Sequence, residues 1–333
     1  MPMKKREQIK PAPIRENEYI KKEFVSYQEM AEHAPDWSLF CNYQLEPNGM
    51  NGQYDILKLP NMQLAFSDMH GGFMFSFEAP KNSICFSLIL EVAGSACFES
   101  MKLKEGMIVV FDDREVYNFM SSGAIKIIDV SVDKDFDSPL LKVLQDTQKM
   151  YFLDDKGSLK ELLLETLTLT EENNDNKKLF ANYKEKIIST MEELVSRQKP
   201  QTPKCTKGEE IALQVRDKLF KHMDVVFDTE YLASEYKATT RTLQSSFKSL
   251  FGYTPQHFIR LLKLNLVHHE LHESTQKETT VLAIAKKWGF MHMGRFSNYY
   301  KKLFSELPSQ TLKKLDIEDD GMRLGCVEIK ESI

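Results

Sequence analysis

Side chains that bind nucleic acid recur in two helical segments in the last third of this 333-residue sequence. In each segment, apolar residues spaced three and four apart predict the buried face of a helix, so the remaining positions form an exposed face. Arginine binds guanine edges with two hydrogen bonds, glutamine does the same with adenine, and lysine commonly contacts phosphate. The candidate DNA-binding residues on these faces are Arg241, Gln244, Ser245 and Lys248 in the first helix, and His292, Arg295, Asn298, Lys301 and Lys302 in the second.

The charge of this region supports the same expectation. Residues 208–314 contain 16 Lys and Arg against 11 Asp and Glu, although the whole chain has a net charge of -5. The stretch before this region and the tail 315–333 are both acidic. A surface that faces phosphates gives such an excess, and so does an ordinary solvated surface. Within the region we expect Arg241, Gln244 and Arg295 to read bases.

An internal repeat contains the two helices. Each copy reads as a short helix, a break, and a second amphipathic helix that ends before a proline. A small residue in the first helix, Ala233 or Ala285, lets the second helix cross closely, as a helix-turn-helix requires. Between the copies, Pro255 to Leu271 is predicted to be one continuous helix of about 25 Å. The positions that match at an offset of 52 or 53 residues are Leu232, Ala233, Tyr236, Leu243, Phe247, Lys248, Leu250, Phe251 and Pro255 with Ile284, Ala285, Trp288, Phe296, Tyr300, Lys301, Leu303, Phe304 and Pro308.

Residues 208–314 resemble the DNA-binding domain of the AraC/XylS transcriptional regulators. The resemblance is carried by Arg241-Thr242-Leu243-Gln244 with Phe247-Lys248, by Phe251-Gly252 followed by Pro255, and by 285–312, which reads AKKWGFMHMGRFSNYYKKLFSELPSQTL. Its GRF and LPS-x-TL pieces are most similar to the subgroup of ethanolamine-operon regulators. The resemblance implies seven helices with two helix-turn-helix units, activation of transcription at double-stranded promoter DNA, and contact with RNA polymerase. The sequence departs from the family pattern at a few positions: Lys237 stands where many relatives have glycine, Ser245 and Ser246 stand where arginine is frequent, and Ser305 replaces the usual glycine.

The first part of the chain has a different periodicity. Short apolar runs between turn residues predict a β-rich region over 53–136, and spacings of three and four predict helices over 137–198. Residues 199–207 read as a linker. We therefore expect a two-domain α+β protein: an effector-binding or dimerisation domain over 1–198 with a cupin-like β-barrel, and an all-α DNA-binding domain over 208–314. The stripe Phe180, Tyr183, Ile187, Met191 and Leu194 suits either a packing face on the barrel or a helical seam between two subunits of a homodimer.

The barrel interior is the candidate site for a small-molecule effector. Phe73, Phe75, Phe86 and Leu88 are the candidate effector-binding residues, although each could equally be plain core. Five scattered cysteines predict neither a disulfide framework nor a zinc site. His268 and His272 lie one turn apart, but HHELH does not match a known zinc motif. We expect no catalytic residue, no metal and no cofactor.

The leading hypothesis is therefore a ligand-controlled transcriptional activator. No apolar run is long enough to cross a bilayer, and no signal peptide is recognisable, so a cytoplasmic location is expected. Two alternatives remain open. The first is a constitutive regulator whose N-terminal domain only dimerises. The second is an enzyme with a reactive cysteine, such as Cys85 or Cys97, fused to a DNA-binding module.

Overall fold

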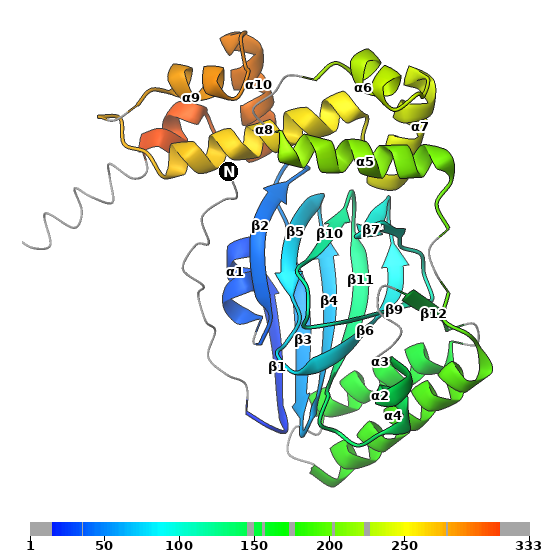
Figure 1. Cartoon of the computed structure of the whole chain (residues 1–333). Helices are drawn as coiled ribbons and strands as arrows, with labels where there is room; N and C mark the ends of the chain where they lie inside the picture. Colours follow the sequence, from blue (N-terminus) through cyan, green and yellow to red (C-terminus); the bar gives the residue numbers. More distant parts are fainter. Residues whose placement is uncertain are drawn as a thin grey trace, which may run out of the picture. The chain divides into compact units, whose positions relative to one another are not determined.

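The chain folds into two compact units, whose main boundary lies between Thr206 and Lys207. The computed structural model describes residues 15–34, 36–144, 150–154, 157–172, 177–201, 204–222, 227–277 and 279–313. A β-rich unit followed by a helical unit confirms the two-domain α+β class (Figure 1). The N-terminal unit comprises Met1–Asn42, Gly49–Thr206 and Ser249–Gly252, and the C-terminal unit comprises Tyr43–Asn48, Lys207–Lys248 and Tyr253–Ile333.

The described strands form two antiparallel sheets. The seven-stranded sheet has the order β1-β3-β4-β11-β6-β9-β12, and the five-stranded sheet has the order β2-β5-β10-β7-β8. Among these strands no pairing joins the two sheets, so the expected barrel takes the form of two separate sheets. The strands are β1 (Glu18–Phe24), β2 (Ser38–Gln44), β3 (Asn51–Leu59), β4 (Met62–His70), β5 (Phe73–Glu78), β6 (Ser83–Val92), β7 (Ala96–Phe98), β8 (Met101–Lys102), β9 (Met107–Asp112), β10 (Tyr117–Ser121), β11 (Ile125–Asp133) and β12 (Met150–Leu153).

Both faces of the seven-stranded sheet are buried. Successive side chains of a strand point to opposite faces. Leu88 and Ile128 therefore belong to an apolar cluster on one face, together with residues of the neighbouring helices. Ile89 and Ile127 belong to a second cluster on the other face, which includes aromatic residues of the five-stranded sheet. As a result, β6 is buried at eight consecutive positions from Ser83 to Leu90.

Three helices supply the cover for the first of these faces: α2 (Pro139–Leu144), α3 (Ser158–Glu172) and α4 (Lys177–Arg197). Phe180, Ile187 and Met191 of α4 are no more than 1% exposed and pack into the same cluster as Leu88. The apolar stripe on α4 is thus a packing face within the N-terminal unit. A short helix, α1 (Tyr27–His33), follows β1, with the hydroxyl of Ser26 accepting the first capping hydrogen bond.

From Lys207 onward the secondary-structure elements of the described chain are all helices. The two copies of the repeat have matching lengths, since both first helices have seven residues and both second helices have twelve. A further helical segment covers 308–313, which makes seven helical segments in this part of the described chain. The named helices are α5 (Lys207–Lys221), α6 (Thr229–Glu235), α7 (Thr240–Phe251), α8 (Pro255–His272), α9 (Val281–Lys287) and α10 (Met293–Phe304).

Each copy has two residues in the left-handed backbone conformation, one in the turn between its helices and one after its second helix. In the turn between the helices, Lys237 has a φ of 54° and Gly289 has a φ of 86°, and both turns close with a 2.9 Å backbone hydrogen bond. After the second helix, Gly252 has a φ of 77° and Ser305 has a φ of 60°. Glycine adopts this conformation without the steric cost that a Cβ atom brings. Each copy therefore has glycine at one of the two left-handed positions and a strained residue at the other.

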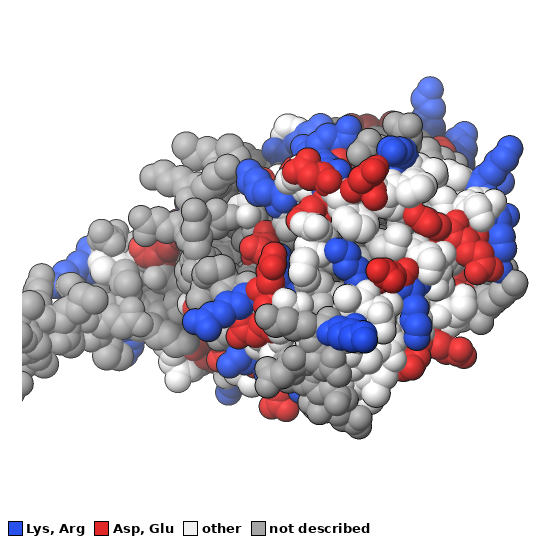
Figure 2. Space-filling model, turned by 90° about the horizontal axis from the view of Figure 1, so that it is seen from below, with Lys and Arg blue, Asp and Glu red and all other residues white. Residues whose placement is uncertain are grey.

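On one face of the molecule, positively and negatively charged side chains are interspersed. Lys and Arg side chains lie among Asp and Glu side chains on the face drawn in Figure 2. Within the described ranges, no helix combines the length and apolar character that a membrane span requires.

Replacing the strained residues with glycine should stabilise the C-terminal unit. We expect Lys237→Gly and Ser305→Gly each to raise its free energy of unfolding by about 0.5–1 kcal/mol, because the left-handed strain is relieved. Urea unfolding, with α7 and α10 followed by pulsed hydrogen exchange, measures the change. The matched control is Gln214→Gly, an exposed position in the middle of α5, which should destabilise the unit by about 0.5–1 kcal/mol. Equal destabilisation by all three variants would contradict the role of strain.

Candidate nucleic-acid interface and ligand cavity

The second helix of each copy has one buried and one exposed face. All nine candidate DNA-binding residues, from Arg241 to Lys302, are exposed in the structure. The apolar residues that were expected to face the core are no more than 3% exposed: Leu243, Phe247 and Leu250 in α7, and Phe296, Tyr300 and Leu303 in α10. The helices thus hold their polar candidates away from the core, with backbone geometry rather than contacts between the candidates fixing their positions.

Capping sets where the first of these helices begins. The backbone amide of Thr242 donates a 3.0 Å hydrogen bond to the hydroxyl oxygen of Thr239, so Thr239 caps the N-terminus of α7. This bond fixes the first turn, from which Arg241 projects. His292 precedes α10 but makes no side-chain capping bond. Its imidazole is exposed at the start of the second recognition helix.

The two helices offer related but unequal sets of side chains. The offset of 53 residues places Lys248 of α7 at the position of Lys301 of α10. Arg241 and Arg295 do not correspond, because the equivalent of Arg241 is Gly294. The two copies therefore share a lysine suited to phosphate and differ in the placement of the arginine suited to bases.

Polar and aromatic contacts hold α10 against α8. The Nδ1 atom of His268 lies 2.7 Å from the hydroxyl oxygen of Tyr300, and its ring stacks on Phe304 at 4.1 Å between centroids. The Tyr300 hydroxyl lies 2.8 Å from that of Thr311, which in turn donates a hydrogen bond to Glu306. This chain of contacts fixes the second recognition helix to the connecting helix. The first is fixed by an edge-on ring contact between Phe247 and Phe258.

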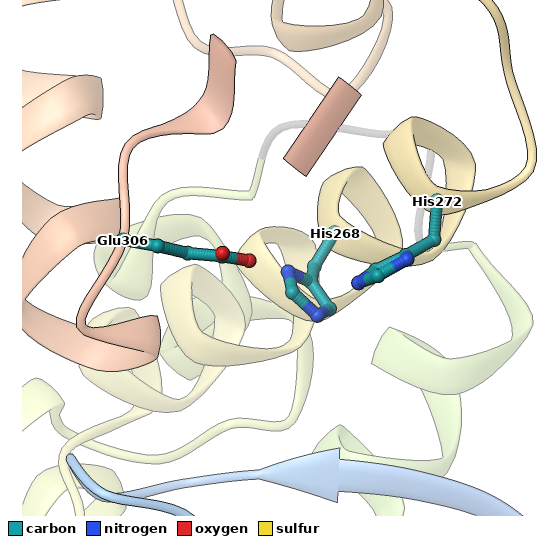
Figure 3. A group of neighbouring side chains, drawn as sticks. All are labelled: His268, His272 and Glu306. Atoms are coloured by element: carbon teal, nitrogen blue, oxygen red, sulfur yellow. The ribbon is translucent and has the colours of Figure 1, made fainter. Parts of the chain in front are cut away.

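His268, His272 and Glu306 lie close together at this junction (Figure 3). Their nearest nitrogen and oxygen atoms lie within 4.8 Å of one another, a grouping that could be compatible with a metal ion. However, Nδ1 of His268 is within hydrogen-bonding distance of Tyr300, and Oε1 of Glu306 accepts from Thr311. The His268 ring also packs against α10, through Tyr300 and Phe304. These contacts give the cluster a structural role in positioning α10.

A cavity of about 110 Å³ opens within the N-terminal unit. One wall is the inner face of the seven-stranded sheet, including Ile89 and Ile127, and the opposite wall includes Phe77 and Phe119 of the five-stranded sheet. Trp37 also lines the space, with its ring 5.7 Å from that of Phe77. A concave, mainly apolar space with a few polar groups is the usual form of a small-molecule site.

The four candidate effector-binding residues are not all at this cavity. Phe75 lines it, as expected for an inward-facing residue. Phe86 and Leu88 lie on the opposite face of the seven-stranded sheet, in the cluster with the helices. Phe73 belongs to the inner cluster but is not among the residues that line the cavity. The structure thus brings Phe75 alone of the four to the cavity wall.

One carboxyl group stands on the cavity wall. Asp129 in β11 lies opposite Ala65 in β4 and Ser87 in β6, and the hydroxyl of Ser87 donates a hydrogen bond to the carboxylate. Burial raises the pKa of Asp129 from 3.8 to about 6, and the bond from Ser87 offsets only part of this effect. Sequence reasoning missed Asp129, although an acidic residue in the middle of an apolar strand is a recognisable signal.

The thiols offer no support for nucleophilic chemistry. Cys85 and Cys97 are buried and form no disulfide, and burial raises the pKa of Cys85. A thiol with a raised pKa has little of the reactive thiolate at neutral pH. Cys205 is half-buried and also forms no disulfide. The side chains of Cys41 and Cys326 lie outside the described parts of the chain.

Asp129 should make the stability of the N-terminal unit depend on pH. Its folded pKa of about 6 exceeds the ordinary 3.8, so the unfolded state releases its proton first and stability falls as pH rises between these values. We expect Asp129→Asn to stabilise the unit relative to wild type by about 2–3 kcal/mol more at pH 7.5 than at pH 3.5. Urea unfolding at both pH values, with β6 and β11 followed by pulsed hydrogen exchange, measures this difference. A pH-independent effect of the substitution would be the contrary result.

The repeat matches known helix-turn-helix proteins. Residues 232–314 match a family model described as a helix-turn-helix domain. Over 103 residues the chain is 33% identical to the XylDLEGF operon transcriptional activator 2 of Pseudomonas putida, a match that covers 31% of this chain and 61% of that protein. Over 85 residues it is 35% identical to another XylDLEGF operon transcriptional activator of Pseudomonas putida, which covers 26% of each chain. The chain thus spans less than two thirds of either relative.

Two solved structures show similarity over different lengths. A probable AraC family transcriptional regulator from Rhodopseudomonas palustris CGA009 is 28% identical, over 32% of this chain and 96% of that one, with a TM-score of 0.30. The AraC-like transcriptional activator CuxR is 13% identical, over 74% of this chain and 94% of that one, with a TM-score of 0.41. The duplicated helices, their exposed polar faces and the sequence match over 232–314 agree. Residues 232–314 of this chain therefore form a helix-turn-helix domain that is similar in sequence to the XylDLEGF operon transcriptional activators.

Proposed function

We propose that this protein regulates transcription by binding double-stranded DNA through α7 and α10, one in each of two successive major grooves. The observation that carries the proposal is the repeated pair of helices, in which both second helices bury their apolar residues and expose every candidate DNA-binding residue. In this arrangement Arg241, Gln244 and Arg295 read base edges. Lys248 and Lys301 contact phosphates, and Ser245, His292, Asn298 and Lys302 complete the two faces.

The length of α8 supports binding of both copies to one side of the duplex. Its 18 residues span about 27 Å, and successive major grooves on one side of DNA are about 34 Å apart. The recognition helices contact α8 through Phe258 near its start and His268 near its end. One chain would then read an asymmetric site of about two helical turns.

Activation is the direction of control that we propose. The relatives from Pseudomonas putida are named transcriptional activators, and the family resemblance extends this role to contact with RNA polymerase. The GRF and LPS-x-TL pieces support a place near the ethanolamine-operon regulators. We also propose a homodimer from the family resemblance. Because the apolar stripe of α4 is buried within its own unit, such a dimer would use another surface.

The N-terminal unit is proposed to bind a small-molecule effector in its cavity. The Tyr54 hydroxyl on the cavity wall is buried without a hydrogen-bond partner in the described structure. Because buried polar groups normally have such a partner, this hydroxyl and the cavity itself favour a ligand site over a unit that only dimerises. A ligand controls the protein only if it binds one conformational state more tightly than the other. A constitutive regulator remains the alternative, and it predicts that no small molecule changes DNA affinity.

Arg295→Ala should lower both affinity and sequence preference. We expect specific binding to weaken by about 1–3 kcal/mol, with one base position relaxed, because a bidentate contact to a base is lost. The measurement is fluorescence anisotropy of full-length protein on a duplex selected from random DNA, compared with its single-base variants. Lys142→Ala, an exposed lysine on α2 in the other unit, is the control and should change neither quantity. Equal losses on specific and random duplexes would show that Arg295 does not read a base.

The equivalent lysines should act alike and without regard to sequence. Lys248→Ala and Lys301→Ala are each expected to weaken binding to specific and random DNA by the same factor. Each should also reduce the slope of log affinity against log salt by about 1, because one phosphate contact is lost. Anisotropy titrations at several salt concentrations measure the slope. An unchanged slope for either variant would remove that lysine from the phosphate contacts.

A further inference from the structure

The cavity wall has an unequal distribution of charge. Asp129 supplies a carboxyl group, and among the described residues that line the cavity there is no Lys, Arg or His. The other polar side chains at the wall are the hydroxyls of Tyr54, Ser67 and Ser87. At neutral pH Asp129 is largely ionised, because burial raises its pKa only to about 6. A ligand would therefore meet one negative charge that no basic residue at the wall neutralises.

The strand register gathers these oxygen atoms on one face of the sheet. Asp129 lies between Ala65 and Ser87 across three neighbouring strands. The adjacent row contains Ser67, which stands opposite Tyr54 in β3. Side chains at alternate positions share a face, so both rows point into the cavity. Ala65, Ser67 and Ser87, which have small side chains, line the cavity together with Asp129.

The remainder of the wall is aromatic and aliphatic. Phe75, Phe77, Phe98, Phe111 and Phe119 line the cavity with Trp37, and several of their rings are in mutual contact. Such rings pack against apolar groups and also attract cations through their faces. The volume of about 110 Å³ is comparable to the roughly 150 Å³ of a cavity that accepts benzene. Because this space is also partly open, it can take a single small ring whose short substituent extends toward the opening.

We propose that the cavity binds a small organic ammonium ion, whose charged group contacts Asp129 and whose apolar body lies among the aromatic rings. This inference rests on the proposed role of the cavity as the effector site and adds the chemical class of the effector. A carboxylate of the same size is rejected, because its charge would oppose that of Asp129 without a neutralising cation. A neutral alcohol fits the space but gains no ionic contact.

Three probes of similar size test the class of ligand. Benzylammonium, benzyl alcohol and benzoate are titrated into the full-length protein at pH 7.5 by isothermal calorimetry. Benzylammonium should bind at least tenfold more tightly than benzyl alcohol, and benzoate should bind more weakly than both. Equal or tighter binding of benzoate or benzyl alcohol overturns the proposed class while leaving the cavity a ligand site. Absence of binding by all three overturns the class and the ligand site together.

Two variants and a control test the role of the carboxylate. Asp129→Asn keeps the shape of the side chain and should reduce benzylammonium affinity at least tenfold, with benzyl alcohol changed less than twofold. Ser87→Ala removes a hydroxyl but keeps the charge, so the preference for ammonium should persist. Glu91→Gln alters an exposed carboxylate on β6, the strand of Ser87, and should leave the affinity for all three probes unchanged. An unchanged preference for benzylammonium in Asp129→Asn would overturn the assignment.

Measuring DNA affinity with and without the probe distinguishes ligand binding from a regulatory role of the cavity. Saturating benzylammonium should change the affinity of full-length protein for its selected duplex, and Asp129→Asn should abolish the change. If benzylammonium binds but DNA affinity stays constant, the ligand class holds and the role of the cavity in control is wrong. If DNA affinity changes equally in Asp129→Asn, the effect arises elsewhere and the proposal fails.

Discussion

The N-terminal unit depends on the burial of both faces of one sheet. A strand that is buried on both sides must place apolar side chains at consecutive positions, as β6 does from Ile84 to Phe86 and from Leu88 to Leu90. One face then needs the helices α2 to α4, and the other needs the aromatic face of the second sheet. Asp129 and Ser87 are exceptions on the inner face. Buried polar groups are tolerated where they are hydrogen-bonded, and this pair satisfies that condition beside the cavity.

In the C-terminal unit the governing constraint is the backbone path. The two copies keep the same helix lengths and the same left-handed turns, although Lys237 stands in one turn where Gly289 stands in the other. The buried faces also use different apolar residues at matching positions, such as Leu243 and Phe296. Geometry is therefore shared while exposed side chains differ. This combination lets one architecture present two different sets of hydrogen-bonding groups.

The sequence predicted the C-terminal unit better than the N-terminal unit, for a physical reason. The recognition helices are half-exposed, so the spacing of Phe296, Tyr300 and Leu303 alone identifies their outward positions. In β6 both faces are buried, so alternation disappears and the inward residues cannot be chosen from the pattern. The expected effector residues Phe86 and Leu88 consequently lie on the helix-covered face. The strands β1, β2 and β12 lie outside the expected 53–136 range.

In the proposed complex, the length of the connecting helix α8 relates the positions of the two copies to the helical repeat of the duplex. Each residue added to it would rotate the second copy by about 100° and advance it by about 1.5 Å. Seven added residues would restore the rotation but move the copy by about 10.5 Å, the length of roughly three base pairs, over which the duplex itself turns by about 100°. A longer α8 that restores the rotation of the second copy therefore still leaves that copy out of step with the grooves of the duplex. In the proposed complex, the 18 residues of α8 would therefore set the distance between the two half-sites on the DNA.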